Sequence, residues 1–346
     1  MPFICPDLMA FYRAGTGGRK QADFDIIWFR FRVSKLYILV YVFSNIILLI
    51  MLGLESSSIS VSSRANGIGA EISGVDLSNS LDDKTFASIS AAFDTYRLLI
   101  FRGQDLTAAE QVAFSERFGR LEDFPDPKDQ ADGFKTVLRV TNIDRTTGGI
   151  KPVDDPGHKS FTLGTSSWHI DSSFRKLPSR ASMLYGIEIP EEGGDTMFAD
   201  TTIAYDALSE DRRQELHKLT VIHDFEETRR RHKLPPRPPE VQAATPPARH
   251  PLVTQRENGR RALFIGSHAA GIDGMSYEDA RRLIDGLAAE ASKPECTYRH
   301  KWSPGDLVMF DNICVMHQAM PYDLAGSRRL LHRTTVAGNQ PLAPVD

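Results

Sequence analysis

Two histidines and one aspartate are spaced in this sequence as ligands of a single metal ion. His169 and Asp171 form the one His-x-Asp motif of the chain, and His317 ends a later strand-like stretch. Positions i and i+2 of a strand face the same side, so both side chains of the motif can reach one ion. The motif alone also arises by chance in a chain with ten histidines. With His317 it predicts a two-histidine, one-carboxylate Fe(II) centre, which leaves coordination positions open for O2 and a cosubstrate.

Two arginines follow His317 at positions that suit anionic ligands. Arg333 lies sixteen residues after His317, and Arg329 has the same strand parity, so we expect both to face one side of a strand. A guanidinium group binds a carboxylate through two parallel hydrogen bonds. Two buried arginines would be costly without anionic partners, which favours two anionic ligands. The alternative is that one or both arginines pair with acidic side chains at the surface.

The elements that would position these residues are mostly short strands. Apolar runs separated by turn residues favour a sandwich or a barrel. Helices are indicated where a capping residue precedes apolar residues at three- and four-residue steps. We therefore expect a mainly β fold with flanking helices. The expected strands cover residues 137–143, 182–189, 262–266, 306–312 and 330–338, and the expected helices follow Asp82, Thr107, Ser209 and Ser276.

Residues 229–248 form a segment rich in proline and basic residues. This composition predicts a solvated, flexible loop. A lid over the substrate is the alternative.

An apolar run over residues 36–54 sets the N-terminal part of the chain apart. The run carries no charge, follows Arg30, Arg32 and Lys35, and is just long enough to span a bilayer. Three interpretations stay open: a membrane anchor, a mis-assigned start with true initiation near Met51, and an apolar accessory helix. We therefore divide the chain into an N-terminal extension, residues 1–55, and a catalytic domain, residues 56–346.

Charge and cysteine content limit the partners and the compartment. The net charge is −4, so no basic excess favours nucleic acid or an anionic membrane surface. The three cysteines include no Cys-x-x-Cys pair, which argues against a disulfide framework and for a reducing compartment, the cytoplasm. We expect the protein to bind a small-molecule substrate and no nucleic acid. It would contact a membrane only if residues 36–54 are an anchor, and a homo-oligomer is possible.

Several blocks of sequence resemble the family of Fe(II)/2-oxoglutarate enzymes that includes taurine dioxygenase and 2,4-dichlorophenoxyacetate dioxygenase. The resemblance runs from about Gly67 to Gly338 and leaves residues 1–55 without a counterpart. WHIDSSF, FIGSHAAGIDG and YRHKWSPGDLVMFDN are more similar to the aryloxyacetate-cleaving branch than to taurine dioxygenase. The matching blocks are SGVDL (73–77), LIFRGQDLTAAEQVAFSERFGRLE (99–122), WHIDSSF (168–174), GGDTMFAD (193–200), RRALFIGSHAAGIDG (260–274), YRHKWSPGDLVMFDNICVMH (298–317) and RRLLHRTT (328–335).

The resemblance implies a double-stranded β-helix, or jelly roll, with His169, Asp171 and His317 as iron ligands. It implies that Thr196 and Arg333 bind the distal carboxylate of 2-oxoglutarate, and that Arg329 meets the anionic group of the substrate. His268 matches a position near the substrate pocket, although a lone histidine beside an apolar strand is more often a core residue; Gly271 replaces the next histidine of the pattern.

The implied reaction is hydroxylation of an aryloxyalkanoate with ether cleavage, with release of succinate and CO2. A sulfonate or alkyl sulfate ester is the alternative substrate. A non-catalytic jelly-roll binding protein or a membrane-anchored sensor is the alternative from another class.

Overall fold

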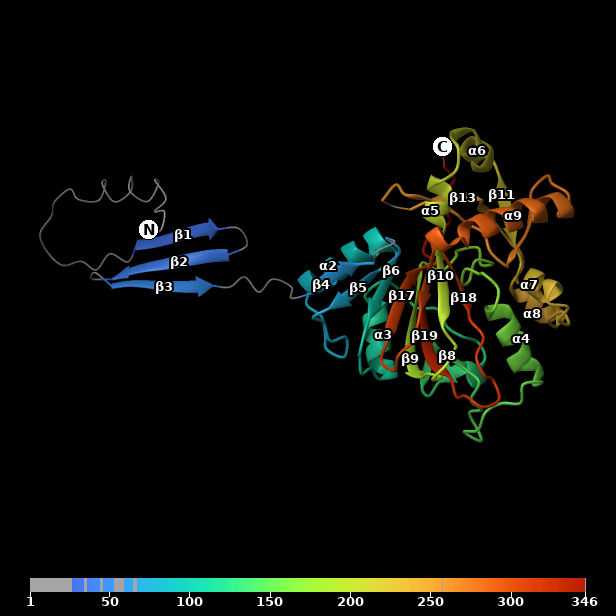
Figure 1. The fold of residues 1–346 in the computed structure, drawn as a ribbon, viewed down its shortest axis with the longest axis horizontal. Coiled ribbons are helices and arrows are strands. Elements are labelled where there is room, and N and C mark those ends of the chain that lie inside the picture. Colours follow the sequence, from blue (N-terminus) through green and yellow to red (C-terminus); the bar gives the residue numbers. More distant parts are fainter. Residues whose placement is uncertain are drawn as a thin grey trace, which may run out of the picture. The chain divides into compact units, whose positions relative to one another are not determined.

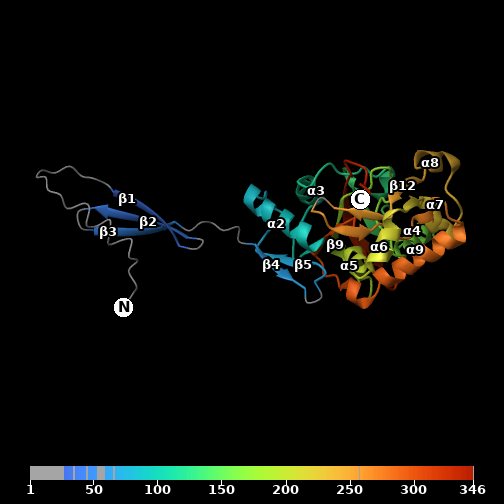
Figure 2. The same cartoon turned by 90° about the horizontal axis from the view of Figure 1, so that it is seen from above.

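The computed structural model describes residues 27–33, 36–43, 46–52, 59–64, 67–256 and 258–345, and gives the backbone alone for the first three ranges. The chain divides into two compact units, Met1–Ser57 and Ser58–Asp346. Figures 1 and 2 show the elements of both units.

The first unit contains three antiparallel strands in the order β1-β2-β3. Two of them occupy the apolar run, so the helical forms proposed for it, an anchor and an accessory helix, are at odds with the structure. The run is rich in β-branched and aromatic residues, which favour extended backbone. In the described part of the chain, no helix is long and apolar enough to cross a bilayer. Initiation near Met51 stays a prediction. The strands are β1 (Ile27–Val33), β2 (Leu36–Phe43) and β3 (Ile46–Leu52).

The second unit is built on an eight-stranded sheet with the order β4-β5-β6-β17-β9-β19-β8-β7. Neighbouring strands run antiparallel except for β5 and β6, which are parallel. The strands predicted from the apolar runs are confirmed in β8, β9, β17 and β19. The bounds are β4 (Ser60–Ser63), β5 (Ala70–Ser73), β6 (Leu98–Phe101), β7 (Gln130–Ala131), β8 (Phe134–Thr141), β9 (Ala181–Glu188), β17 (Leu307–Asp311) and β19 (Leu330–Val336).

Helices α2 (Asp83–Tyr96) and α3 (Ala108–Glu116) cover one face of this sheet. Asp82 caps α2 by accepting a hydrogen bond from the Thr85 backbone, and Thr107 and Glu110 form the predicted capping box of α3. The central strand β17 is buried on both faces, because Met309 packs with the helices whereas Phe310 packs on the opposite side. Both faces of the sheet therefore anchor other elements.

The opposite face packs against a three-stranded antiparallel sheet with the order β16-β10-β18. Side chains of both sheets form one core, with Phe198 from the small sheet and Leu331 from the large one. Arg333 projects from the same face of its strand as Leu331, so it points between the sheets. The small-sheet strands are β10 (Thr196–Asp200), β16 (Thr297–His300) and β18 (Val315–Ala319).

A further group of short strands and helices packs around a third apolar core. The helices expected after Ser209 and Ser276 are confirmed as α6 and α9, each capped by its serine. These elements are α5 (Thr201–Asp206), α6 (Glu210–His217), β11 (Thr220–His223), β12 (Ala248–Pro251), β13 (Val253–Gln255), β14 (Arg261–Leu263), β15 (Ala269–Ile272), α9 (Tyr277–Ala291) and the 3-10 turn Pro294–Cys296; a second 3-10 turn, Pro127–Asp129, precedes β7.

Three helices, α4 (Pro156–Thr165), α7 (Phe225–Arg231) and α8 (Pro239–Ala244), lie on the side of the second unit opposite α2 and α3 (Figures 1 and 2). The segment predicted to be a flexible loop is partly helical here. Arg237 pairs with Glu226 at 2.5 Å and its guanidinium lies 4.2 Å from the ring centre of Phe225. Specific ionic and aromatic contacts thus order part of a segment whose composition indicates a loop.

Candidate metal centre and substrate cavity

The three predicted metal ligands converge although they lie on different segments. His317 is in β18, whereas His169 and Asp171 lie in the connection between α4 and β9 rather than on a regular strand. A single β-bridge joins the segments: each histidine backbone N–H donates to the other's carbonyl, at 3.0 and 2.8 Å. One ligand atom from each residue lies within 4.8 Å of the other two. The backbone bridge therefore replaces the continuous strand expected from the sequence.

Burial and charge prepare these side chains for a cation. Burial lowers the pKa of both His169 and His317, so their imidazoles are neutral and offer lone pairs. Burial opposes ionisation of Asp171, but the Arg333 guanidinium and the two histidines outweigh it and hold the pKa of Asp171 below its usual range. Two neutral imidazoles and one carboxylate are the donor set that suits Fe(II).

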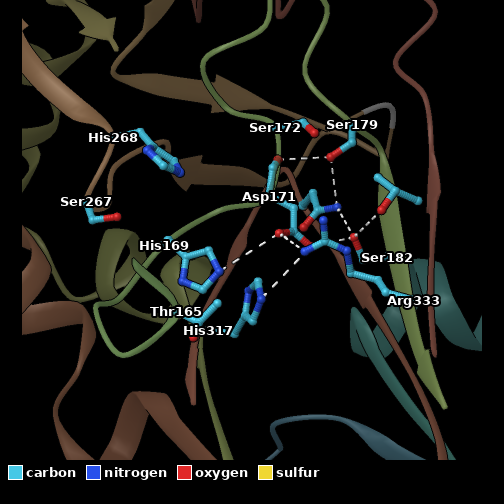
Figure 3. Close-up of polar contacts among 12 residues, drawn as sticks. Thr165, His169, Asp171, Ser172, Ser179, Ser182, Ser267, His268, His317 and Arg333 are labelled. Atoms are coloured by element: carbon cyan, nitrogen blue, oxygen red, sulfur yellow. Dashed lines mark hydrogen bonds and ion pairs between the residues drawn. The ribbon is translucent and has the colours of Figure 1, made fainter. Parts of the chain in front are cut away.

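Hydrogen bonds behind the ligands fix their orientation (Figure 3). His169 Nδ1 donates to the Ser167 carbonyl at 2.8 Å, which leaves Nε2 as the ligand atom. The Ser182 hydroxyl donates to Asp171 Oδ2 at 2.8 Å, and Asn312 Nδ2 donates to that hydroxyl at 2.9 Å. Ser182 and Asn312 were not predicted as site residues, because neither type nor spacing distinguishes them from other polar residues at strand ends.

The two predicted arginines lie in different surroundings. Arg333 Nη1 lies 2.6 Å from Asp171 Oδ1, so this guanidinium is beside the metal ligands. Arg329 is 5 % exposed, and its Nε and Nη2 donate to the Gly194 carbonyl at 3.2 and 3.0 Å. Among the described residues Arg329 makes no ion pair, and burial lowers its pKa to about 10. It is a buried cation that still lacks an anion.

Thr196 lies at the start of β10, two residues after Gly194, whose carbonyl accepts hydrogen bonds from Arg329. A Cβ on Gly194 would come within 3.2 Å of Arg329 Nε, so the glycine allows the guanidinium to approach this strand. The Thr196 hydroxyl accepts a hydrogen bond from Trp302 Nε1 at 3.0 Å. Thr196, Arg329, Arg333, His169 and His317 all line one cavity of about 280 Å³.

His268, the remaining predicted site residue, does not line this cavity. Its ring centre lies 6.4 Å from that of His169, and it packs between the rings of Phe174 and Phe225 at 5.1 and 5.3 Å. Burial lowers the pKa of His268 to about 3, so the ring is neutral. In Figure 3 it lies beside His169 and away from Arg333.

Comparison with known proteins identifies the family. Residues 60–335 match the family model "Taurine catabolism dioxygenase TauD, TfdA family". An alpha-ketoglutarate-dependent 2,4-dichlorophenoxyacetate dioxygenase of Cupriavidus pinatubonensis is 34% identical over 283 residues, 77% of this chain and 94% of that protein. An (S)-phenoxypropionate/alpha-ketoglutarate-dioxygenase of Sphingobium herbicidovorans is 33% identical over 279 residues, 78% of this chain and 92% of that protein.

The fold agrees with this match. The crystal structure of AAD-2 in complex with Mn(II) and N-oxalylglycine superposes with a TM-score of 0.76 and 32% identity, over 84% of this chain and 99% of that one. The chain belongs to the TauD/TfdA family of 2-oxoglutarate-dependent dioxygenases.

Proposed function

We propose that this protein uses Fe(II), 2-oxoglutarate and O2 to hydroxylate a small aryloxyalkanoate at the carbon next to its ether oxygen. The hemiacetal so formed collapses to a phenol and an oxo acid, while 2-oxoglutarate is converted to succinate and CO2. The observation that carries the proposal is the convergence of His169, Asp171 and His317 on one point, beside a cavity that also holds two arginines. The curated relatives named for 2,4-dichlorophenoxyacetate and phenoxypropionate support the substrate class.

The donor set fits the metal. His169 Nε2, His317 Nε2 and the Asp171 carboxylate would hold Fe(II), which when bound supplies the O2-dependent oxidation. The protein fixes the ligand atoms through Ser167, Ser182 and Asn312 and keeps them away from bulk water, because each ligand residue is at most 6 % exposed.

For the arginines we propose roles that reverse those implied by family resemblance. The distal carboxylate of 2-oxoglutarate must lie a chain length away from the metal, whereas Arg333 contacts a metal ligand directly. Arg329, which makes no ion pair among the described residues and lines the same cavity as Thr196, is the better partner for that carboxylate. Arg333 would then meet the carboxylate of the organic substrate close to the metal. In that arrangement the distal carboxylate neutralises the buried Arg329, and the substrate carboxylate meets the partly buried Arg333, which also pairs with Asp171.

Part of the remaining lining of the cavity is apolar. Val140, Leu184 and Leu331 come from three neighbouring strands of the large sheet and line the cavity together with the arginines. Such walls exclude water and strengthen the ionic contacts inside. A double-stranded β-helix formed by the two packed sheets is part of the same proposal, as is a location in the reducing cytoplasm, which the free, buried Cys296 and Cys314 support.

A sulfate ester is the second candidate substrate. An alkylsulfatase of Acinetobacter baylyi is 32% identical over 280 residues, and an alpha-ketoglutarate-dependent sulfate ester dioxygenase of Pseudomonas putida is 30% identical over 287 residues. An arginine beside the metal would bind a sulfur oxyanion as well as a carboxylate, so the cavity by itself is compatible with both classes.

A substrate panel tests the proposal. The protein is loaded with Fe(II) under anaerobic conditions and given 2-oxoglutarate, air and one of several compounds: phenoxyacetates, phenoxypropionates, taurine or alkyl sulfates. We expect the phenoxy acids to stimulate succinate release most and to yield the phenol in equal amount. Stimulation by alkyl sulfates alone would favour the second candidate, and no stimulation by any compound would contradict both.

A further inference from the structure

Helix α4 presents one face to the cavity beside the metal centre. His158, Phe161, Thr162 and Thr165 recur at three- and four-residue steps and all line the cavity, as expected for one side of a helix. Asp155 and Pro156 define where the helix begins: the Asp155 side chain accepts a hydrogen bond from the His158 backbone at 2.7 Å. On the outer side, Arg229 of α7 donates to the Ser160 hydroxyl at 2.7 Å. These contacts hold the inward face in place.

His158 is the unusual residue on this face. It is only 5 % exposed, yet neither ring nitrogen has a hydrogen-bond partner among the described residues. A buried polar group without a partner costs about 1–3 kcal/mol. Of the other two cavity histidines, His169 has its Nδ1 bonded to the Ser167 carbonyl, whereas His317 Nδ1 is also without a partner among the described residues. The imidazole of His158 is therefore placed for a partner that enters the cavity.

The cosubstrate does not supply that partner. In the proposed arrangement the distal carboxylate of 2-oxoglutarate meets Arg329 and the other carboxylate lies at the metal. The rest of the molecule is a keto oxygen at the metal and two methylene groups. His158 and Thr165 are seven residues apart, about 10 Å along a helix axis. A group that reaches His158 thus belongs to a second, longer ligand.

We propose that His158 is a specificity-determining residue that hydrogen-bonds a neutral polar substituent on the organic substrate, at the end remote from the substrate's carboxylate. This inference rests on the proposed function and extends it to a substrate class, hydroxyl- or amide-bearing aryloxyalkanoates. Burial and the Lys151 charge lower the pKa of His158, so its ring is neutral and offers one donor and one acceptor nitrogen. A hydroxyl or an amide complements this pair. Phe161 supplies the adjacent apolar contact for the ring that carries the group.

The test compares phenoxyacetate with its three ring-hydroxylated derivatives, in the wild-type protein and in His158→Leu and His158→Asn. We expect the wild-type protein to favour one hydroxylated derivative by roughly three- to tenfold in kcat/KM, the range for one neutral hydrogen bond. The ratio of kcat/KM between the hydroxylated derivative and phenoxyacetate should fall to about one in His158→Leu. It should be partly restored in His158→Asn. The KM for 2-oxoglutarate stays unchanged in both variants.

A stability measurement provides a readout that does not depend on activity. Removing an unpartnered imidazole should leave the melting temperature of the metal-free protein unchanged or raise it. His217 in α6 is the control, because its Nε2 is bonded to the Tyr205 hydroxyl at 2.8 Å, although its Nδ1 has no partner among the described residues. His217→Leu should lower the melting temperature.

Three results would overturn the assignment of His158: an unchanged preference in His158→Leu, a change confined to the KM for 2-oxoglutarate, or a loss of stability as large as in His217→Leu. The absence of succinate release from the wild-type protein with every phenoxy acid would overturn the proposed function as well, and so is distinguishable from failure of this inference alone.

Discussion

Two buried arginines of the second unit show how a structural charge differs from a functional one. Arg97, at the end of α2, lies 2.6 Å from Asp200, and both side chains are almost completely buried. Arg329 is equally buried, but among the described residues its guanidinium contacts a backbone carbonyl and the ring of Tyr322 and no carboxylate. The Arg97 pair connects the helix layer to the small sheet with its charges compensated. The charge of Arg329 is compensated only when an anion enters the cavity.

The two regions differ in whether their buried polar groups have partners within the protein. Around the Arg97 pair, Thr202 also bonds to Asp200, so this carboxylate is well supplied with donors. In the cavity, the Nε of Arg333 and both nitrogens of His158 are buried without a partner among the described residues. Unsatisfied polar groups lower stability, and those that line the cavity can gain partners when ligands bind.

Breaking the structural pair should have the largest effect on stability. Arg97→Met leaves Asp200 as an uncompensated buried charge, and we expect the free energy of unfolding to fall by about 3–5 kcal/mol, measured by urea denaturation. The double variant Arg97→Met/Asp200→Asn should lose less than the sum of the single losses. Additive losses would show that the two side chains do not act as a pair.

Removing the unpaired cation should leave stability intact and abolish cosubstrate binding. Arg329→Met should raise the dissociation constant of 2-oxoglutarate by roughly 30- to 1000-fold, the range for truncating one partner of a buried charged contact. The melting temperature of the free protein should stay or rise. Binding is measured by anaerobic titration with Fe(II) present.

Arg328 is the matched control for this prediction. It is the preceding residue, but it is exposed and pairs with Glu188, so Arg328→Met should change binding by less than a factor of two to three. A large loss of 2-oxoglutarate binding in Arg333→Met with little loss in Arg329→Met would instead support the roles implied by family resemblance.

The buried His268 should make stability depend on pH. Its pKa falls from 6.5 to about 3 on folding, so the unfolded chain takes up a proton first as the pH decreases below 6.5. The contribution of His268 to the free energy of unfolding should drop by about 2 kcal/mol between pH 6.5 and pH 5. His268→Leu should show a correspondingly flatter dependence in urea denaturation, and an unchanged slope would contradict the burial of a neutral ring.

The smallest effect is expected at Thr196. Thr196→Val removes one hydroxyl from the cavity that Arg329 also lines, so the KM for 2-oxoglutarate should rise roughly three- to tenfold with kcat nearly unchanged. Thr196→Ser retains the hydroxyl and should behave like the wild-type protein in steady-state assays. Equal effects of the two variants would mean that the hydroxyl is not involved.

Local patterns were sufficient to predict much of the second unit. Helix caps at Asp82, Thr107, Ser209 and Ser276 and the apolar strands are determined by nearby residues. The convergence of His169, Asp171 and His317 was predictable because few residue types bind iron. For residues 36–54 three interpretations stayed open, since length and apolarity do not separate a helix from two strands.

Three-dimensional placement was harder to predict than residue type. Strand parity indicated that Arg329 and Arg333 share a face, but not which of them lies beside the metal. That order depends on Gly194 and on the position of Asp171, which are far from the arginines in sequence. The hydrogen bonds that connect Asp171 to Ser182 and Ser182 to Asn312 could not be predicted from the sequence either, because they join residues of different segments.

The most direct test of the central claim is Fe(II) binding by the wild-type protein and by Asp171→Ala, measured anaerobically with 2-oxoglutarate through the visible absorption band of the Fe(II)/2-oxoglutarate complex. We predict a band that saturates at one iron per chain in the wild-type protein. The variant should remain folded by circular dichroism but show no band and no succinate release in air. A wild-type-like band and wild-type-like succinate release in Asp171→Ala would contradict the assignment of this metal centre.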